Sequence, residues 1–185
     1  MFEWIKTWLW KHRLKKDERQ VNRKLKTVSL DNAKSIGIIA SINDEEDLKT
    51  IEGFVHKLKN HEKDISLIVF TPGKEIPNYC IPKLYVDFVP QKMINWFGIP
   101  TGKAIRSFQQ KDFDIVIDLC REHKKETLYM MATSRASMRV GRYNEKWTTY
   151  YDLMLSETDN DKKNLKHYIS ELEKYLNQIN AVNHE

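Results

Sequence analysis

The sequence predicts an α/β protein with a Rossmann-like three-layer fold, in which a mostly parallel five-stranded sheet is preceded by an N-terminal amphipathic helix. From residue 34 onward, short apolar runs alternate with stretches of helical periodicity, the pattern of a parallel sheet covered by helices. The 185 residues, 41% hydrophobic and 31% charged, suffice for one domain with a substantial core. The first 30 residues instead combine aromatic and basic residues at helical spacing.

Each strand is predicted from a short run rich in Val, Ile and Phe, and each helix from apolar residues that recur every three or four positions. The predicted strands cover residues 35–41, 65–71, 84–89, 113–119 and 138–142. The predicted helices cover residues 44–60, 101–110, 124–134 and 161–180. Right-handed crossovers give the strand order 3-2-1-4-5, and a ligand site is then expected at the carboxyl ends of the strands.

The charge of the chain is unevenly distributed. Residues 1–30 hold nine lysines and arginines against three acidic residues, whereas the rest of the chain holds 22 basic and 23 acidic residues. The basic charge therefore belongs to the N-terminal segment, and a nucleic-acid footprint on the domain is not expected. The predicted organisation is a basic amphipathic helix over residues 1–30, one Rossmann-like domain over residues 31–180 and a frayed tail over residues 181–185.

Cysteine usage and hydropathy indicate a cytoplasmic protein. Cys80 and Cys120 are outside any C-x-x-C motif, which fits two structural thiols in a reducing compartment. No apolar run approaches the roughly 18 residues of a membrane span. Lys6 and Lys11 interrupt the short apolar region at the N-terminus, so a signal peptide is not expected either.

The predicted N-terminal helix carries three of the five tryptophans of the chain. An aromatic, basic and amphipathic helix is typical of a segment that lies in a membrane interface, here at the inner face of the membrane. Two other interpretations remain open: the apolar stripe packs on the domain or on a second copy, or the cations bind RNA phosphates. The candidate contact residues are Trp4, Trp8, Trp10, Lys11, Arg13, Lys15 and Lys16.

Several motifs together carry a resemblance to a known family. The segments KSIGIIA, IPKLYVDF, INWFGIP, FDIVIDL and VGRYNEKWTTYYDLML resemble a bacterial (Bacteroidota-type) family of unknown function over roughly residues 30–180. The resemblance implies a single α/β domain behind a basic N-terminal segment, and it implies no activity. The stretch from FDIVIDL to MRVGRYN is also similar to the N-terminal acceptor-side domain of heptosyltransferase-like (GT-B) glycosyltransferases, whose nucleotide-sugar half has no counterpart here.

Polar residues cluster after the fourth and fifth predicted strands. Asp118 ends one strand and is followed by Arg121, while Arg142, Tyr143 and Asn144 end the other. These five residues are the candidate ligand-binding site, because an arginine fork beside hydroxyl and amide groups binds carboxylate, phosphate or sugar. The open alternatives are that Asp118 caps the next loop and that Arg142 pairs with Asp118 or Asp152 to tie the last strands together.

Other stretches carry weaker signals. The four carboxylates after the first strand suit a capped helix start and would repel a pyrophosphate, so no dinucleotide site is expected. Pro100-Thr101-Gly102-Lys103 lacks the spacing of a phosphate loop, and an ordinary helix start is the simpler interpretation. Asn95-Trp96-Phe97-Gly98 forms either an aromatic wall for a sugar ring or a hydrophobic plug.

The sequence therefore favours a non-enzymatic binding or interaction module, because no nucleophile elbow, paired Cys and His or metal-ligand spacing is present. The alternative is a glycosyltransferase-like domain that binds a sugar or phosphate at the rim of the sheet. No cofactor and no metal are expected. The expected partners are an anionic membrane surface or a protein that binds residues 1–30, with a homodimer as a further possibility and specific nucleic acid disfavoured.

Overall fold

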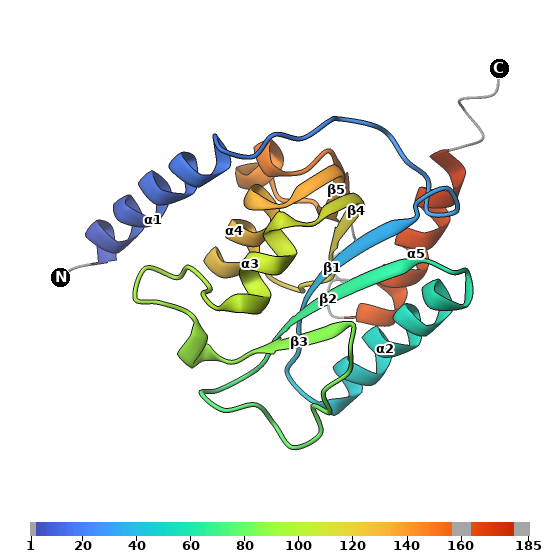
Figure 1. Cartoon of the computed structure of the whole chain (residues 1–185), viewed down its shortest axis with the longest axis horizontal. Helices are drawn as coiled ribbons and strands as arrows, with labels where there is room; N and C mark the ends of the chain where they lie inside the picture. The colour runs from blue at the N-terminus through green and yellow to red at the C-terminus, as the bar shows by residue number, and fades with distance from the viewer. Residues whose placement is uncertain (1–2, 157–163, 180–185) are drawn as a thin grey trace.

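The computed structural model describes residues 3–156 and 164–179, which form a six-stranded sheet covered by helices on both faces (Figure 1). The strand order is β3-β2-β1-β4-β5-β6, and every neighbouring pair is parallel. The strands are β1 Ser35–Ser41, β2 Asp64–Phe70, β3 Val86–Val89, β4 Asp112–Asp118, β5 Arg135–Arg142 and β6 Leu153–Leu155. The predicted order of the first five strands is confirmed, and their bounds lie within three residues of the predicted ones.

The prediction of a five-stranded sheet missed β6. This strand is only three residues long, and it pairs with the end of β5 through Val140, Gly141 and Arg142. Three residues are too few to show strand periodicity. The predicted start of the third strand was also too early, because Leu84 is fully exposed and β3 begins at Val86.

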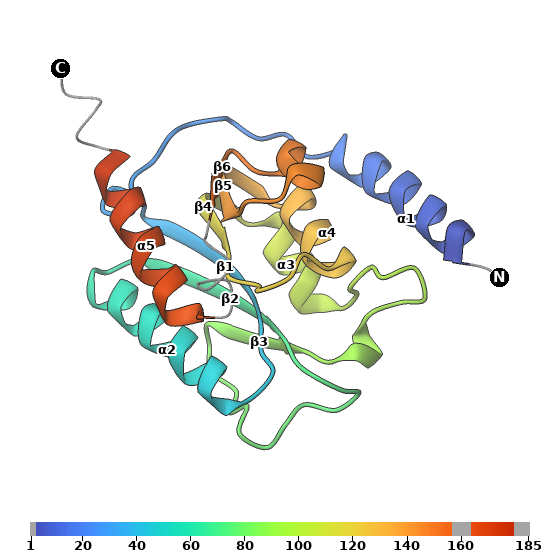
Figure 2. The ribbon, with the colours of Figure 1, turned by 180° about the vertical axis from the view of Figure 1, so that it is seen from behind.

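The helices divide into two layers, as both views show (Figures 1 and 2). Helices α2 and α5 cover one face of the sheet, and α1, α3 and α4 lie on the other. Within the described residues, the α-helices are α1 Glu3–Glu18, α2 Glu45–Asn60, α3 Lys103–Gln110, α4 Lys125–Thr133 and α5 Leu165–Gln178, and the 3-10 helices are η1 Gln91–Met93 and η2 Glu145–Tyr150. The predicted start of the last helix, residues 161–163, and the predicted tail lie outside the described residues.

Strand β1 shows why the central strands read as continuous apolar runs. Ile36, Ile38 and Ala40 belong to the core layer under α2 and α5, whereas Ile39 belongs to the layer under α3 and α4. Successive side chains of a strand point to opposite faces, and both faces of this sheet are buried. The connection changes faces between β1 and β4, which places the expected ligand region at their carboxyl ends.

The predicted N-terminal helix over residues 1–30 is too long. Helix α1 ends at Glu18, and residues 19–34 continue as a strap, mostly without regular secondary structure, that crosses from the layer of α1 to that of α5 (Figures 1 and 2). Arg23 Nε donates to the carbonyl of Ala136 at 3.0 Å, and its guanidinium also pairs with Asp152. These tertiary bonds hold the strap in an extended course, although its apolar residues continue the helical spacing of α1.

Candidate functional site

Four of the five predicted ligand-binding residues lie together at the carboxyl-terminal edge of the sheet. Arg121, Arg142, Tyr143 and Asn144 line a cavity of about 400 Å³, which we call the rim pocket. They come from the segments that follow β4 and end β5, the edge where parallel α/β sheets bind ligands. The other lining residues are Glu122, His123, Leu155 and Ser156.

Asp118, the fifth candidate, does not line the rim pocket and is only 1% exposed. Its carboxylate accepts a 2.7 Å hydrogen bond from the phenol of Tyr151 and a 2.8 Å bond from the backbone N–H of Cys120. Burial, together with the charge of Asp118, raises the pKa of the Tyr151 phenol far above its usual range. Asp118 therefore holds the segments after β4 and β5 together from inside the core.

The two arginines of the rim pocket are held by the fold. Arg121 makes a bidentate pair with Asp47 at 2.6 and 2.5 Å. Arg142 is 5% exposed, donates from Nε to the carbonyl of Cys120 at 3.1 Å, and lies 3.7 Å above the ring of Tyr168. Burial lowers the pKa of Arg142. The more accessible groups of the rim pocket are thus supplied by its other residues.

Tyr143 and Asn144 differ in their roles at the rim. The side chain of Tyr143 is 55% exposed, which leaves most of its ring available at the surface. The side-chain oxygen of Asn144 accepts a 3.0 Å bond from the backbone N–H of Lys146 and so caps the 3-10 helix η2. The expected partner Asp152 binds Arg23 and the backbone N–H of Arg139.

The acidic start of α2 is a self-capped helix end, as the sequence indicates. Asp44 accepts a 3.0 Å bond from the backbone N–H of Asp47, and Asp47 accepts a 2.9 Å bond from that of Asn43. Asp47 also pairs with Arg121 across the position where the sheet connection changes faces. Carboxylates and their own backbone partners therefore occupy the place where a phosphate would meet a helix N-terminus.

Helix α1 presents two different faces. Trp10 and Leu14 are each 1% exposed, and Trp10 meets Trp147 edge to face at 6.1 Å between ring centres. The inclusion of Trp10 among the surface contact residues was therefore wrong, because the ring lies in the core layer with α4. Trp4 and Trp8 are 72% and 60% exposed. The four basic candidates, Lys11, Arg13, Lys15 and Lys16, are also exposed.

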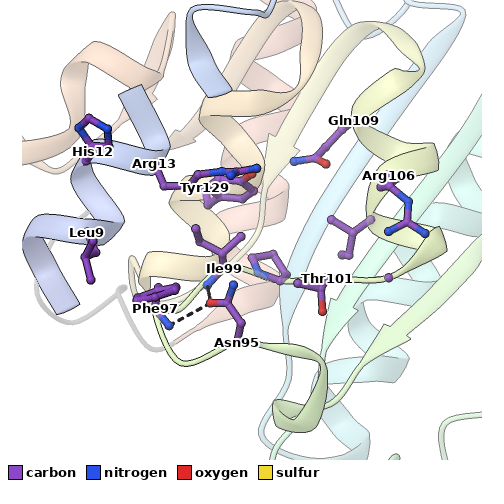
Figure 3. Close-up of a pocket in the computed structure, with 13 residues that line it drawn as sticks. Leu9, His12, Arg13, Asn95, Phe97, Ile99, Thr101, Arg106, Gln109 and Tyr129 are labelled. Atoms are coloured by element: carbon purple, nitrogen blue, oxygen red, sulfur yellow. Dashed lines mark hydrogen bonds between the residues drawn. The ribbon is translucent and has the colours of Figure 1, made fainter. Parts of the chain in front are cut away.

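A second cavity, of about 510 Å³, lies between α1 and α3, and we call it the α1 pocket (Figure 3). It is formed where α1 and α3 meet the 95–102 loop and Tyr129 of α4. The side-chain oxygen of Asn95 accepts bonds from the backbone N–H groups of Phe97 and Ile99, which fixes the loop (Figure 3). Phe97 and Asn95 line the α1 pocket, whereas the ring of Trp96 is 58% exposed and contacts Lys6.

The α1 pocket was not predicted from the sequence. Its residues come from four separate stretches, and only the docking of α1 brings them together. The aromatic segment 95–98 is a part of the α1 pocket for which the sequence does indicate a role, either as a wall of a ligand site or as a hydrophobic plug.

Residues 3–156 and 164–179 lack two further features. In this part of the chain no group of three His, Cys, Asp or Glu residues is placed to hold a metal ion. None of the helices described here combines the length and the apolar character that crossing a bilayer requires.

Comparison with known proteins identifies one protein family. No curated protein and no solved structure shows significant similarity to the chain. The family model that matches describes a family of unknown function, DUF6913, and it covers residues 6–179, which include most of α1, the strap and the whole sheet. Because the match extends over nearly the entire chain, the protein belongs to the DUF6913 family.

Proposed function

We propose that the protein is a non-enzymatic binding module that attaches to an anionic membrane surface through the outward face of α1. The observation that carries this proposal is the orientation of the tryptophans in α1. Trp10 packs into the core with Leu14, while Trp4 and Trp8 face away from the domain. A helix fixed in this way presents its exposed rings permanently, without partial unfolding of the domain.

The outward face combines the two residue types that favour a membrane interface. Trp4, Trp8, Lys11 and Lys15 follow the helical spacing of one face, and all four are exposed. Tryptophan rings lie favourably at the depth of the lipid headgroups, and lysines are attracted to anionic lipid by about 1 kcal/mol each. Two rings and a few cations support reversible attachment.

The distribution of charge over the chain also supports attachment through this end. The N-terminal 30 residues carry nine basic and three acidic residues, whereas the rest of the chain has nearly balanced charge. Helix α1 holds five of these basic residues and all three acidic ones, and the strap holds the other four basic residues, so the excess positive charge is shared by α1 and the strap. The attraction should weaken as salt rises, because the Debye length is about 8 Å at physiological ionic strength.

Vesicle flotation tests the proposal. The protein should float with anionic vesicles, less so with neutral vesicles, and the double variant Trp4→Ser/Trp8→Ser should lose most of this binding. The matched control is Leu84→Ser/Tyr175→Ser, which removes two exposed apolar side chains elsewhere on the surface. Equal flotation of the two double variants would contradict attachment through α1.

A charge variant completes the test. Lys11→Gln/Lys15→Gln/Lys16→Gln should reduce anionic flotation more than Lys74→Gln/Lys103→Gln/Lys166→Gln, although both variants remove three charges. All six lysines are exposed. Light scattering on the same proteins tests whether a second copy of the chain binds this face instead. A molecular mass that falls only in the Trp4→Ser/Trp8→Ser variant would indicate a homodimer contact.

A second candidate function is sugar or phosphate binding in the rim pocket, as a glycosyltransferase-like domain. The observation that favours it is the meeting of Arg121, Tyr143 and Asn144 around one cavity at the carboxyl edge of the sheet. A thermal-shift series with sugar phosphates tests it, with Tyr143→Ala as the variant because this side chain is exposed. Stabilisation that grows with ligand and disappears in Tyr143→Ala is expected, and no shift at millimolar ligand would rule it out.

A further inference from the structure

We propose that the α1 pocket binds an amphipathic organic anion, with the apolar body of the ligand against Leu9, Phe97 and Ile105 and its anionic group at Arg106. This inference goes beyond the proposed attachment to membranes. It concerns a different surface of the molecule, and the ligand could equally be dissolved or a lipid.

The size and lining of the α1 pocket suit a small amphipathic molecule. Its volume of about 510 Å³ is within the usual range of ligand sites, roughly 300–1,000 Å³. Apolar side chains from three segments form much of the wall. These residues are Leu9 of α1, Phe97, Ile99 and Pro100 of the loop, and Ile105 of α3.

The charge of the lining selects an anion. Among the residues that line the α1 pocket, Arg13 and Arg106 carry positive charge and none is an aspartate or glutamate. Figure 3 shows the two arginines on different elements, Arg13 on α1 and Arg106 on α3. Asp17 pairs with Arg13, so the charge that no carboxylate balances is that of Arg106. A cationic ligand would be repelled by this charge, whereas an anion can bind the planar fork of the guanidinium.

The wall next to α1 is fixed by a hydrogen-bonded network that is partly exposed. The carboxylate of Asp17 accepts a 2.6 Å bond from Arg13 Nε and a 2.7 Å bond from the phenol of Tyr129. These bonds join α1 to α4 and hold the lining residues in place before any ligand binds. A preformed wall of this kind lowers the entropic cost of binding.

Arg106 is the arginine that remains available to a ligand. Its side chain is exposed on α3, and within the described residues its hydrogen bond is made by the backbone N–H, to the carbonyl of Gly102, and none is made by the guanidinium. The first turn of α3 contains no acidic residue, so no carboxylate of this turn competes for the guanidinium. We therefore assign the anionic group of the ligand to this side of the α1 pocket.

Titration calorimetry with dodecyl phosphate, kept below its micelle-forming concentration, tests the proposal. The ligand combines a phosphate with an apolar chain, and dodecanol and inorganic phosphate each supply one half of it. Dodecyl phosphate should bind at least about tenfold more tightly than either half, because both walls of the α1 pocket contribute. Equal binding of dodecanol, or of inorganic phosphate, would overturn the proposal.

Two matched pairs of variants locate the site. Arg106→Gln should lower the affinity for dodecyl phosphate about tenfold, a loss typical for a charge-assisted hydrogen bond. Lys103→Gln, on the same helix, should change this affinity less than about twofold. Phe97→Ser should weaken it more than Trp96→Ser, because Phe97 lines the α1 pocket and its neighbour does not. Arg106 is exposed, so this variant remains informative if Phe97→Ser disturbs the loop. Equal affinity within the Arg106 and Lys103 pair would refute the assignment.

Flotation separates the two sources of such a ligand. If the ligand is dissolved, Arg106→Gln and Lys103→Gln float equally on vesicles that contain phosphatidate. If it is a membrane lipid, Arg106→Gln floats less. The proposed ligand binding in the α1 pocket is tested by calorimetry with dodecyl phosphate, and the proposed membrane attachment is tested by flotation of the Trp4→Ser/Trp8→Ser variant. The failure of one proposal can therefore be distinguished from the failure of the other.

Discussion

The phenol of Tyr151 donates a 2.7 Å hydrogen bond to the carboxylate of Asp118, which joins the segment before β6 to the end of β4. Both residues are buried. The ring of Tyr151 also lies against Gly141 of β5, where an added Cβ would come within 2.4 Å of the ring. The bond therefore depends on the absence of a side chain at position 141.

Replacing Tyr151 by Phe should lower the free energy of unfolding by roughly 1–3 kcal/mol. The change removes the donor and leaves the buried carboxylate of Asp118 with one bond fewer, and an unsatisfied buried charge is costly. Urea denaturation followed by circular dichroism measures the loss. Tyr143→Phe is the control, since Tyr143 is exposed, and a similar loss in that variant would contradict the role of the Asp118 bond.

Gly141→Ala and Gly53→Ala should have opposite effects. At Gly141 the new methyl group collides with the ring of Tyr151, and crowding of this kind costs about 1–3 kcal/mol. At Gly53, inside helix α2, a Cβ meets nothing within 4 Å, so alanine should stabilise the helix by about 0.5–1 kcal/mol. Thermal unfolding of the two variants measures both effects. A stabilised Gly141→Ala variant would show that the ring of Tyr151 can move away from the new methyl group.

Most of the sheet could be predicted because its central strands are buried on both faces. Ile36, Ile38 and Ile39 face different core layers, so the run is apolar throughout and stands out from the helices. The end of α1 could not be predicted in this way. Val28 keeps the helical spacing, yet Arg23 binds the carbonyl of Ala136, and contacts between residues so distant along the chain are not visible in local periodicity.

The rim pocket could be predicted in part, because the carboxyl ends of parallel strands meet at one edge. This rule brings Arg142 and Tyr143 near Arg121, but it does not say how deep a side chain lies, and Asp118 turned out to lie inside the core. The α1 pocket required knowledge of how α1 docks. Leu9 and Tyr129 line the same cavity, and nothing in the sequence links these two positions.

Trp10→Ala should release α1 from the domain. The indole is 1% exposed, and loss of a buried tryptophan typically costs about 3–5 kcal/mol. Amide hydrogen exchange should then become faster throughout α1, while the β1 amides are affected less. Trp8→Ala removes an indole that is 60% exposed and should leave the exchange of α1 almost unchanged. Equal protection of α1 in both variants would mean that other contacts hold the helix.

Arg23→Ala should loosen the strap. The guanidinium of Arg23 bonds to the carbonyls of Ala136 and Ser137 and pairs with Asp152, so its removal takes all three bonds from the strap. A loss of roughly 1–3 kcal/mol in unfolding free energy is expected. Limited proteolysis should cut the strap sooner in this variant than in Lys24→Ala, which removes the adjacent basic side chain. Similar cleavage rates would contradict this role of Arg23.

The stability of the protein should fall as the pH rises from about 10 to about 12, and Tyr129 should account for part of the fall. Burial, followed by the hydrogen bond to Asp17, raises the pKa of Tyr129 to about 12, whereas a tyrosine in the unfolded chain titrates near pH 10. Between these values the folded state retains a proton that the unfolded state has lost. Stability contributed by this group is therefore complete below about pH 10 and disappears as the pH approaches 12.

Urea denaturation at several alkaline pH values measures this effect as the difference between the wild type and Tyr129→Phe. The unfolding free energy should fall more steeply with pH in the wild type than in Tyr129→Phe. The difference in slope should be less than about 1.4 kcal/mol per pH unit, which is the limit for one proton, because the phenol borders the α1 pocket and solvent screens its charge. Tyr143→Phe is the control, because it removes the hydroxyl group of an exposed tyrosine. Parallel slopes for the wild type and Tyr129→Phe would show that the bond between Tyr129 and Asp17 does not join α1 to α4 in solution.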